Sequence, residues 1–224
     1  EVSSPGGVQV TGKWVAQTST FEITTSSDAS STIADGSRVV MRVPSVRTPS
    51  CLHTTTAANV SSFDSAGYVV DKPTSVAIAS MSKGALGTPL RWTAANSVPA
   101  VTTDSTVSFR SVGGIKEGGR IKVVLPSVGW SMPSAPVIEF SRPSAVIATA
   151  AWSAGTRTLL ITTTSGEIAE GAAVELIVKD TVTPPSVTES GSASVETFER
   201  VTTGNTTVWP AIDTGSLNTS QIAA

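Results

Sequence analysis

The chain has 224 residues, a formal net charge of −2 and only 14% charged residues, well below the roughly 25% usual in soluble domains. This balance gives no electrostatic reason to expect nucleic acid or an anionic membrane surface as a partner. No apolar run approaches the roughly 18–20 residues of a membrane-spanning helix, so we expect no membrane insertion. Ser and Thr take the place of charged residues, which indicates a surface that is hydrated through hydroxyl groups or through groups attached to them.

Val, Ile and Thr dominate the chain, and Gly or Pro interrupts it at the spacing typical of an all-β sandwich or barrel. Period-2 alternation is cleanest in Ser37–Val43, Arg120–Leu125, Arg157–Thr163 and Ala173–Lys179. We also expect strands at Val8–Val15, Thr20–Thr24, Tyr68–Asp71, Ser75–Ala79, Pro89–Thr93, Ser105–Ser111, Val137–Ser141, Ala145–Trp152, Ser194–Arg200 and Thr206–Trp209.

A turn–strand motif occurs three times, with the pattern Ile-x-acid-Gly-x-x-apolar-x-apolar-x-apolar. Its copies span residues 33–43, 115–125 and 168–178. The Gly after the acid suits a turn because glycine reaches positive φ at no steric cost. The recurrence favours a structural repeat over a glycine-rich phosphate loop, which would need a Lys-Ser/Thr pair and a following helix.

The repeats predict two tandem immunoglobulin-like β-sandwich domains with strand-like terminal segments. Phe21, Phe109 and Phe198 each end a Ser/Thr-rich run, at spacings that suit such modules. We divide the chain into residues 1–20 (an N-terminal strand segment), 21–100 (an incomplete first module), 101–195 (a second module) and 196–224 (a C-terminal extension). The second half of the first module has no copy of the motif, so we expect another chain to enter there.

The terminal segments are the candidate donors for this entry, by addition of a strand to the incomplete sheet. The side chains that we expect at such an assembly interface are Val8, Val10 and Trp14 at one end and Val195, Phe198, Val208 and Trp209 at the other.

We find no catalytic, cofactor-binding or metal-binding residues. Cys51 and His53 are the only Cys and the only His, and two ligands cannot form a structural zinc site. A free Cys51 could also cross-link subunits. Paired carboxylates that could converge in a cleft are missing, so we expect that the protein is not an enzyme.

The tryptophans suggest different roles. Trp92 and Trp152 have similar surroundings in the sequence and are expected in a core. Trp130 could be a surface platform for a sugar ring, which leaves a carbohydrate-binding role open.

Three Asn-x-Ser/Thr sequons predict covalent glycans, at Asn59, Asn205 and Asn218. Thr-Pro contexts suit O-linked sugars at Thr48, Thr88 and Thr183. These acceptors favour an extracellular, secreted or cell-surface protein.

The repeated Phe, the glycine turn with its strand, Trp152 and the segment Val182–Val187 resemble tandem immunoglobulin-like repeats of secreted protist and microalgal surface glycoproteins. They are also similar to protomers of glycosylated extracellular fibrils. The resemblance implies a filament or cell-surface role and no catalytic residues. We therefore expect a structural subunit that assembles with itself head to tail into a helical homopolymer. The alternative is an adhesin or a carbohydrate-binding tandem, with surface glycans as partners.

Overall fold

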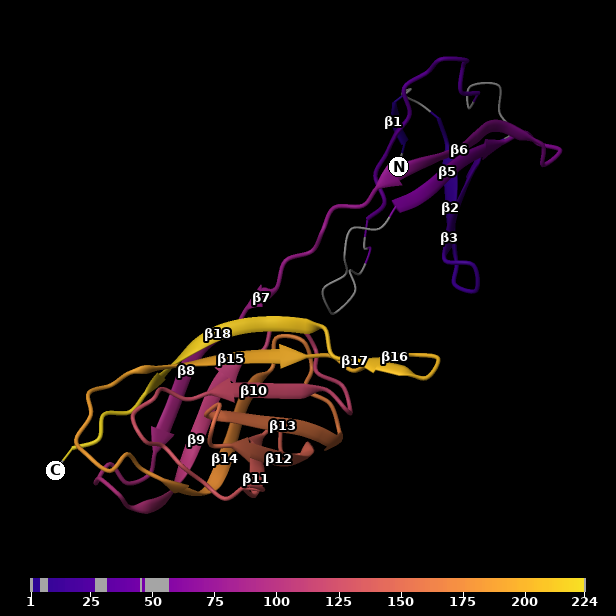
Figure 1. Ribbon diagram of the computed structural model, residues 1–224. Coiled ribbons are helices and arrows are strands. Elements are labelled where there is room, and N and C mark those ends of the chain that lie inside the picture. The colour runs from indigo at the N-terminus through magenta and orange to yellow at the C-terminus, as the bar shows by residue number, and fades with distance from the viewer. Residues whose placement is uncertain (1, 5–7, 27–31, 45, 47–56, 224) are drawn as a thin grey trace. The chain divides into compact units, whose positions relative to one another are not determined.

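The structure, a computed structural model, describes residues 2–4, 8–26, 32–44, 46 and 57–223. The described chain is all-β (Figure 1). It divides into two compact units, Glu1–Thr48 and Pro49–Ala224. Cys51, His53 and Thr48 lie outside the described residues.

The N-terminal unit consists of two small antiparallel sheets. β2 (Val10–Val15) and β3 (Thr20–Thr25) form a hairpin, in which Trp14 pairs with Phe21 and Gly12 with Ile23. β1 (Val2–Ser4) pairs with β4 (Val40–Met41). The alternation of residues 37–43 therefore yields a much shorter strand than we expected.

The C-terminal unit contains a separate hairpin and a large sheet. The hairpin is β5 (Ala57–Phe63) with β6 (Val69–Ala77). The sheet has ten strands, in the order β11-β14-β9-β8-β18-β15-β10-β13-β12, with β7 also paired to β18. Their bounds are β7 Gly84–Ala85, β8 Gly87–Ala94, β9 Thr102–Arg110, β10 Arg120–Val124, β11 Ile138–Arg142, β12 Ile147–Ser153, β13 Thr158–Ser165, β14 Ala173–Val182, β15 Ser192–Phe198 and β18 Ala211–Thr219.

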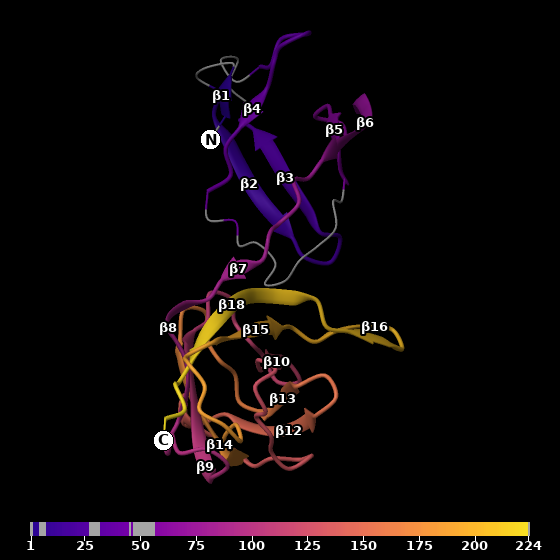
Figure 2. The ribbon, with the colours of Figure 1, turned by 60° about the vertical axis from the view of Figure 1, so that its left-hand side comes forward.

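The large sheet is nearly closed into a barrel-like shape, because its two end strands, β11 and β12, contact each other without ladder pairing. Figures 1 and 2 show a further small hairpin, β16 (Val201–Thr203) with β17 (Thr206–Val208), that projects from this sheet. Alternate residues of each strand point inward, and they fill one hydrophobic core. Its fully buried large side chains include Trp92, Val107, Phe109, Ile121, Leu159, Ile161, Leu176 and Leu217.

The two-sandwich arrangement is not confirmed. β8, which we assigned to the first module, pairs antiparallel with β9 and parallel with β18. β15 and β18 lie in the middle of the same sheet, and they contain residues 196–198 and 211–219 of the segment that we assigned to a C-terminal extension. The strands from β7 onward, apart from the β16–β17 hairpin, thus share one sheet across both expected boundaries.

The glycine turn has the same geometry in all three copies of the motif. Gly36, Gly118 and Gly171 have φ values of 70°, 79° and 69°. In each copy the residue after this glycine donates a backbone hydrogen bond three residues back, over 2.9–3.1 Å. The turn expected from the sequence is therefore present three times.

Candidate assembly site

The β2–β3 hairpin is amphipathic, and its ladder register decides which residues share a face. One face carries Val10, Trp14, Phe21 and Ile23, with Gly12 between them. The phenyl ring of Phe21 lies over Gly12, where a β-carbon would come within 2.7 Å of it. The opposite face is polar, with Thr11, Lys13, Glu22 and Thr24. Such a pattern is typical of a sheet that buries one face.

Within the N-terminal unit this apolar face borders a cavity of about 270 Å³. Its other wall comes from residues 41–44, which follow the first glycine turn. Arg42 is the one charged residue among the residues that line it. The lining suits apolar side chains better than a polar ligand.

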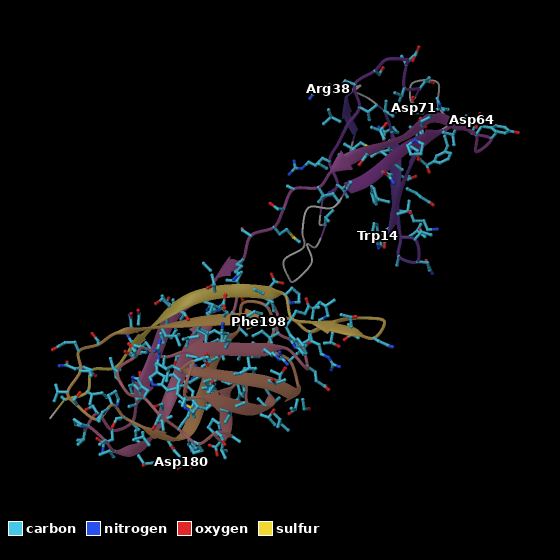
Figure 3. The ribbon with its side chains drawn as sticks, viewed as in Figure 1. Trp14, Arg38, Asp64, Asp71, Asp180 and Phe198 are labelled. Atoms are coloured by element: carbon cyan, nitrogen blue, oxygen red, sulfur yellow. The ribbon has the colours of Figure 1, made fainter. Side chains whose placement is uncertain are left out.

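Apolar exposure is concentrated before residue 80. Val8 is the one buried hydrophobic residue in the described part of that region. Trp14 lies on the hairpin with its side chain 59% exposed (Figure 3). Many other large apolar side chains there are also exposed: Phe21, Ile33, Val39, Val40, Met41, Val43, Val46, Val60, Phe63, Tyr68, Val69, Val70, Val76 and Ile78. Exposed apolar surface of this kind often marks interaction surfaces.

The C-terminal residues expected at the interface serve their own barrel instead. Val195 is fully buried in the core and pairs with Val123. Phe198 is half-buried and pairs with Arg120 and Ala211 (Figure 3). These residues are part of the folded unit, so they are unavailable as donors unless the barrel opens.

Trp209 is also engaged within its own chain. The guanidinium carbon of Arg120 lies 3.4 Å from the centroid of the Trp209 ring, and the indole N–H donates to the carbonyl of Gly118 over 3.1 Å. This cation–π contact fixes the segment between β17 and β18 against β10. Val208 is exposed beside it. Of the residues expected at the interface, Val10 and Trp14 lie on the apolar hairpin face, and Val8 is buried.

Trp130 is buried and does not form a surface platform. Its ring packs edge-on against Trp92, with centroids 5.9 Å apart. The expected sugar platform at Trp130 is therefore wrong. Trp92 and Trp152 are buried as expected, although they lie on different strands, β8 and β12.

The candidate glycosylation sites differ in accessibility. Asn59, Asn205, Asn218 and Thr88 are exposed. Thr183 is buried, and its hydroxyl donates to the carbonyl of Val98 over 2.7 Å while it accepts from the Val101 N–H over 2.9 Å. Thr183 is thus a structural hydroxyl that a glycan could not reach in the folded chain.

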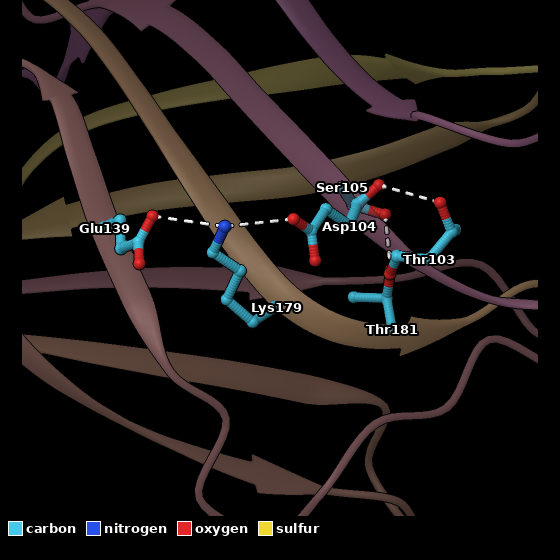
Figure 4. A network of polar contacts seen from close by, with 6 residues as sticks. All are labelled: Thr103, Asp104, Ser105, Glu139, Lys179 and Thr181. Atoms are coloured by element: carbon cyan, nitrogen blue, oxygen red, sulfur yellow. Dashed lines mark hydrogen bonds and ion pairs between the residues drawn. The ribbon is translucent and has the colours of Figure 1, made fainter.

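An ionic cluster links three strands of the large sheet (Figure 4). The amine of Lys179 lies 3.0 Å from a carboxylate oxygen of Asp104 and 3.1 Å from one of Glu139. The hydrogen bonds from Lys179 to Asp104 and Glu139 raise the pKa of Lys179. The amine is therefore held as an ammonium ion, which is not a nucleophile, and the cluster acts as a clamp between β14, β9 and β11.

A bulge follows in β14, where the register shifts between Val178 and Thr181 and Asp180 has a φ of 55°. The Thr181 hydroxyl donates to the Thr103 carbonyl over 2.6 Å and lies 2.7 Å from the Ser105 hydroxyl (Figure 4). The buried polar atoms at the bulge satisfy one another, as a structural role requires.

Among the described residues, no three His, Cys, Asp or Glu side chains gather in an arrangement that could hold a metal ion. Nor does the described part of the chain contain a helix that is long and apolar enough to cross a membrane.

No protein-family model and no curated protein matches this chain. Among solved structures, it is similar to a protein of Corynebacterium diphtheriae assigned as membrane anchored, with 10% identity, a TM-score of 0.29 and coverage of 84% of this chain and 48% of the other. It is also similar to AvmM, which catalyses macrocyclization in alchivemycin A biosynthesis, with 12% identity, a TM-score of 0.27 and coverage of 62% and 88%. The chain thus spans about half the length of the first of these proteins, and neither likeness carries an argument about function.

Proposed function

We propose that this protein is a structural subunit of an extracellular filament or cell-surface appendage, and that it assembles with itself through its N-terminal strands. The observation that carries the proposal is the partly exposed apolar face of the β2–β3 hairpin, with Trp14, Phe21 and Ile23 on one side and polar residues on the other. An isolated two-stranded hairpin is marginally stable in water, so such a face gains stability when another surface covers it.

The free energy of burying apolar side chains supports self-assembly. Burial of one large apolar side chain contributes about 1.5–3 kcal/mol. Several side chains of this size are exposed in the N-terminal unit, so their burial between copies can offset the entropy that association costs.

Strand addition is the mode of assembly that the topology favours. Among the residues that the structure describes, β3 pairs with β2 alone, so its other edge can offer backbone groups to an incoming strand. In the C-terminal barrel, each strand pairs with a neighbour on both sides, except β7, β11 and β12. We therefore assign the assembly role to the N-terminal residues, and leave the C-terminal barrel as a stable, self-contained element.

We further infer that the barrel is a single immunoglobulin-like domain over residues 84–222, in place of the two that the repeats predicted. The strand order β8-β9-β14-β11 corresponds to the A-B-E-D sheet of that fold, and β10, β15 and β18 correspond to C, F and G. β12 and β13 extend the second sheet beyond C. Exposed sequons at Asn59, Asn205 and Asn218 support an extracellular location with attached glycans.

Sedimentation and multi-angle light scattering of the full chain over a range of concentrations test the proposal. We expect concentration-dependent association, and elongated particles by negative-stain microscopy. Trp14→Ser should weaken association, whereas Val137→Ser should not, although both side chains are 59% exposed. A chain that stays monomeric at every concentration, or two variants that associate equally well, would contradict it.

A further inference from the structure

Two copies of the turn–strand motif face each other inside the barrel. The N–H of Ile115 donates to the carbonyl of Ile168 over 2.8 Å, and the N–H of Ile168 donates to the carbonyl of Ile115 over 2.8 Å. Each isoleucine occupies the first position of its motif, three residues before the positive-φ glycine. The motif thus pairs with itself, with the two copies related as if by a two-fold axis.

This reciprocal pair seals part of the core. Ile115 and Ile168 are 0% and 1% exposed. The alternate apolar residues that follow each turn are buried in the same hydrophobic cluster: Ile121, Val123 and Leu125 in one copy, and Val174, Leu176 and Val178 in the other. Both copies are therefore fully engaged by each other and by the strands beside them.

The first copy of the motif has the same turn but no such partner. Gly36 has the same positive φ, and the Ser37 N–H donates to the Ala34 carbonyl over 3.1 Å. Ile33 is 38% exposed, and among the described residues it takes part in no β-bridge. Val39, Met41 and Val43, which match the buried residues of the other copies, are exposed as well.

The geometry points to a second copy of this chain as the missing partner. We infer that the glycine turns of the first motif copy in two molecules pair with each other around a two-fold axis, with Ile33 opposite Ile33 of the partner subunit, as Ile115 lies opposite Ile168. This inference rests on the proposed self-assembly and adds to the contact of the β2–β3 hairpin a second contact, which has two-fold symmetry. The other two copies are buried, so the matching motif that is still exposed is the same segment of another molecule.

A contact of this kind is isologous, which means that each subunit offers the same surface. It requires the residue on the axis to pair with itself. In a hydrogen-bonded antiparallel pair the two α-carbons lie about 5.5 Å apart, a separation that a disulfide can bridge. A cysteine at position 33 therefore reports the symmetry directly.

The test is Ile33→Cys in a Cys51→Ser background, oxidised with diamide and analysed by non-reducing electrophoresis and mass spectrometry. The matched control is Ile147→Cys in the same background, because Ile147 is also an exposed isoleucine but lies on β12 of the barrel. Circular dichroism checks that both variants keep the β structure of the parent.

We expect most of the Ile33→Cys chains to form a disulfide-linked dimer that diamide does not produce with Ile147→Cys. If the parent chain associates in light scattering but Ile33→Cys does not cross-link above the control, the two-fold pairing is overturned while self-assembly stands. If the parent chain is monomeric at every concentration, both are overturned. A cross-link that forms equally with both variants reflects random collision and also overturns the pairing.

Discussion

The carboxylate of Asp213 occupies the space that a β-carbon on Gly84 would need, at the point where β7 runs parallel to β18. Such a β-carbon would also lie 3.2 Å from that of Val112. Asp213 is buried, so its side chain has little room to move away. Gly84 therefore permits the close approach of β7 to β18.

Gly84→Ala should lower the free energy of unfolding by about 1–3 kcal/mol, because the added methyl group overpacks a buried site. Urea unfolding of the full chain measures this. Gly155→Ala is the control, since no atom lies within 4 Å of a β-carbon there, and its effect should stay within about 0.5 kcal/mol. Equal effects of the two substitutions would show that Asp213 does not restrict position 84.

Asp213 also holds the segment between β9 and β10 in place. Its carboxylate accepts hydrogen bonds from the N–H groups of Val112 and Gly113, each over 3.1 Å, and from the hydroxyl of Thr197 over 3.4 Å. Asp213→Asn turns one acceptor into a donor that faces other donors, and should cost about 1–3 kcal/mol in unfolding free energy. Asp180→Asn, at an exposed position, should change little, because Asn tolerates its positive φ. If Asp213→Asn leaves the unfolding free energy unchanged, this role of the carboxylate is refuted.

A third prediction concerns pH. The hydrogen bond from Lys83 to Glu196, 2.7 Å long, and the nearby Lys122 lower the pKa of Glu196 below its ordinary value of 4.5. A lowered folded-state pKa means that this interaction stabilises the fold above about pH 4.5, and that the stabilisation is lost as the pH falls through the folded-state value. Because the pair is partly exposed, its contribution should be below about 1 kcal/mol.

Glu196→Gln should therefore reduce the unfolding free energy at pH 7, and the difference from the parent should shrink toward zero as the pH falls through the lowered folded-state pKa of Glu196. Thermal unfolding across this pH range measures the difference. Glu189→Gln, at an exposed position, is the control, and it should change the unfolding free energy little at pH 7. A Glu196→Gln deficit that persists unchanged at low pH would mean that packing, not charge, is responsible.

Local features of the fold could be predicted from the sequence, and long-range ones could not. The glycine turns at residues 36, 118 and 171 depend on nearest neighbours, and they form as expected. So do the strands that contain Arg120–Val124, Thr158–Thr163 and Ala173–Lys179. The parallel pairing of β8 with β18 places Arg91 opposite Asn218. These residues are far apart in the sequence, so no local sequence pattern predicts that they pair.

The misjudged C-terminus has a physical reason. β18 turns Asp213 and Thr219 inward among Ile212 and Leu217, so its hydrophobic alternation is interrupted by buried polar residues. β15 likewise buries Thr197, whose hydroxyl pairs with Asp213. A strand stabilised by buried hydrogen bonds is therefore easily taken for a polar extension. The shared strand face of Val10 and Trp14 could be predicted because these residues alternate with polar neighbours.

Glycosylation gives a fourth prediction, with a matched pair of acceptors. Thr88 and Thr183 both precede proline, but Thr88 is exposed and Thr183 is buried with its hydroxyl in two hydrogen bonds. When the chain is secreted from a eukaryotic host, peptide mass spectrometry should find Thr183 unmodified. Asn205, exposed at the turn between β16 and β17, should be the most fully occupied sequon. Glycans on Thr183 would mean that modification precedes folding.

The last prediction concerns the residue after the turn glycine, which is Ser37, Gly119 or Ala172 in the three motif copies. A side chain is tolerated in two of them, so the turn itself does not require glycine there. At Gly119, however, a β-carbon would lie 2.8 Å from the carbonyl oxygen of Lys116 and 2.9 Å from that of Phe198. The Phe198 oxygen is a backbone atom held by the ladder between β10 and β15, so it cannot give way easily.

Gly119→Ala should therefore cost about 2–3 kcal/mol in unfolding free energy, measured in urea, through overpacking against fixed backbone. Ala172→Gly is the matched control at the equivalent position, and it should cost below about 1 kcal/mol, from backbone entropy alone. If the two substitutions have the same effect, the close approach of Phe198 is not what selects glycine at position 119. If the two effects differ as expected, glycine occupies position 119 because β15 packs against it. The equivalent positions of the first and third copies, Ser37 and Ala172, do not require glycine.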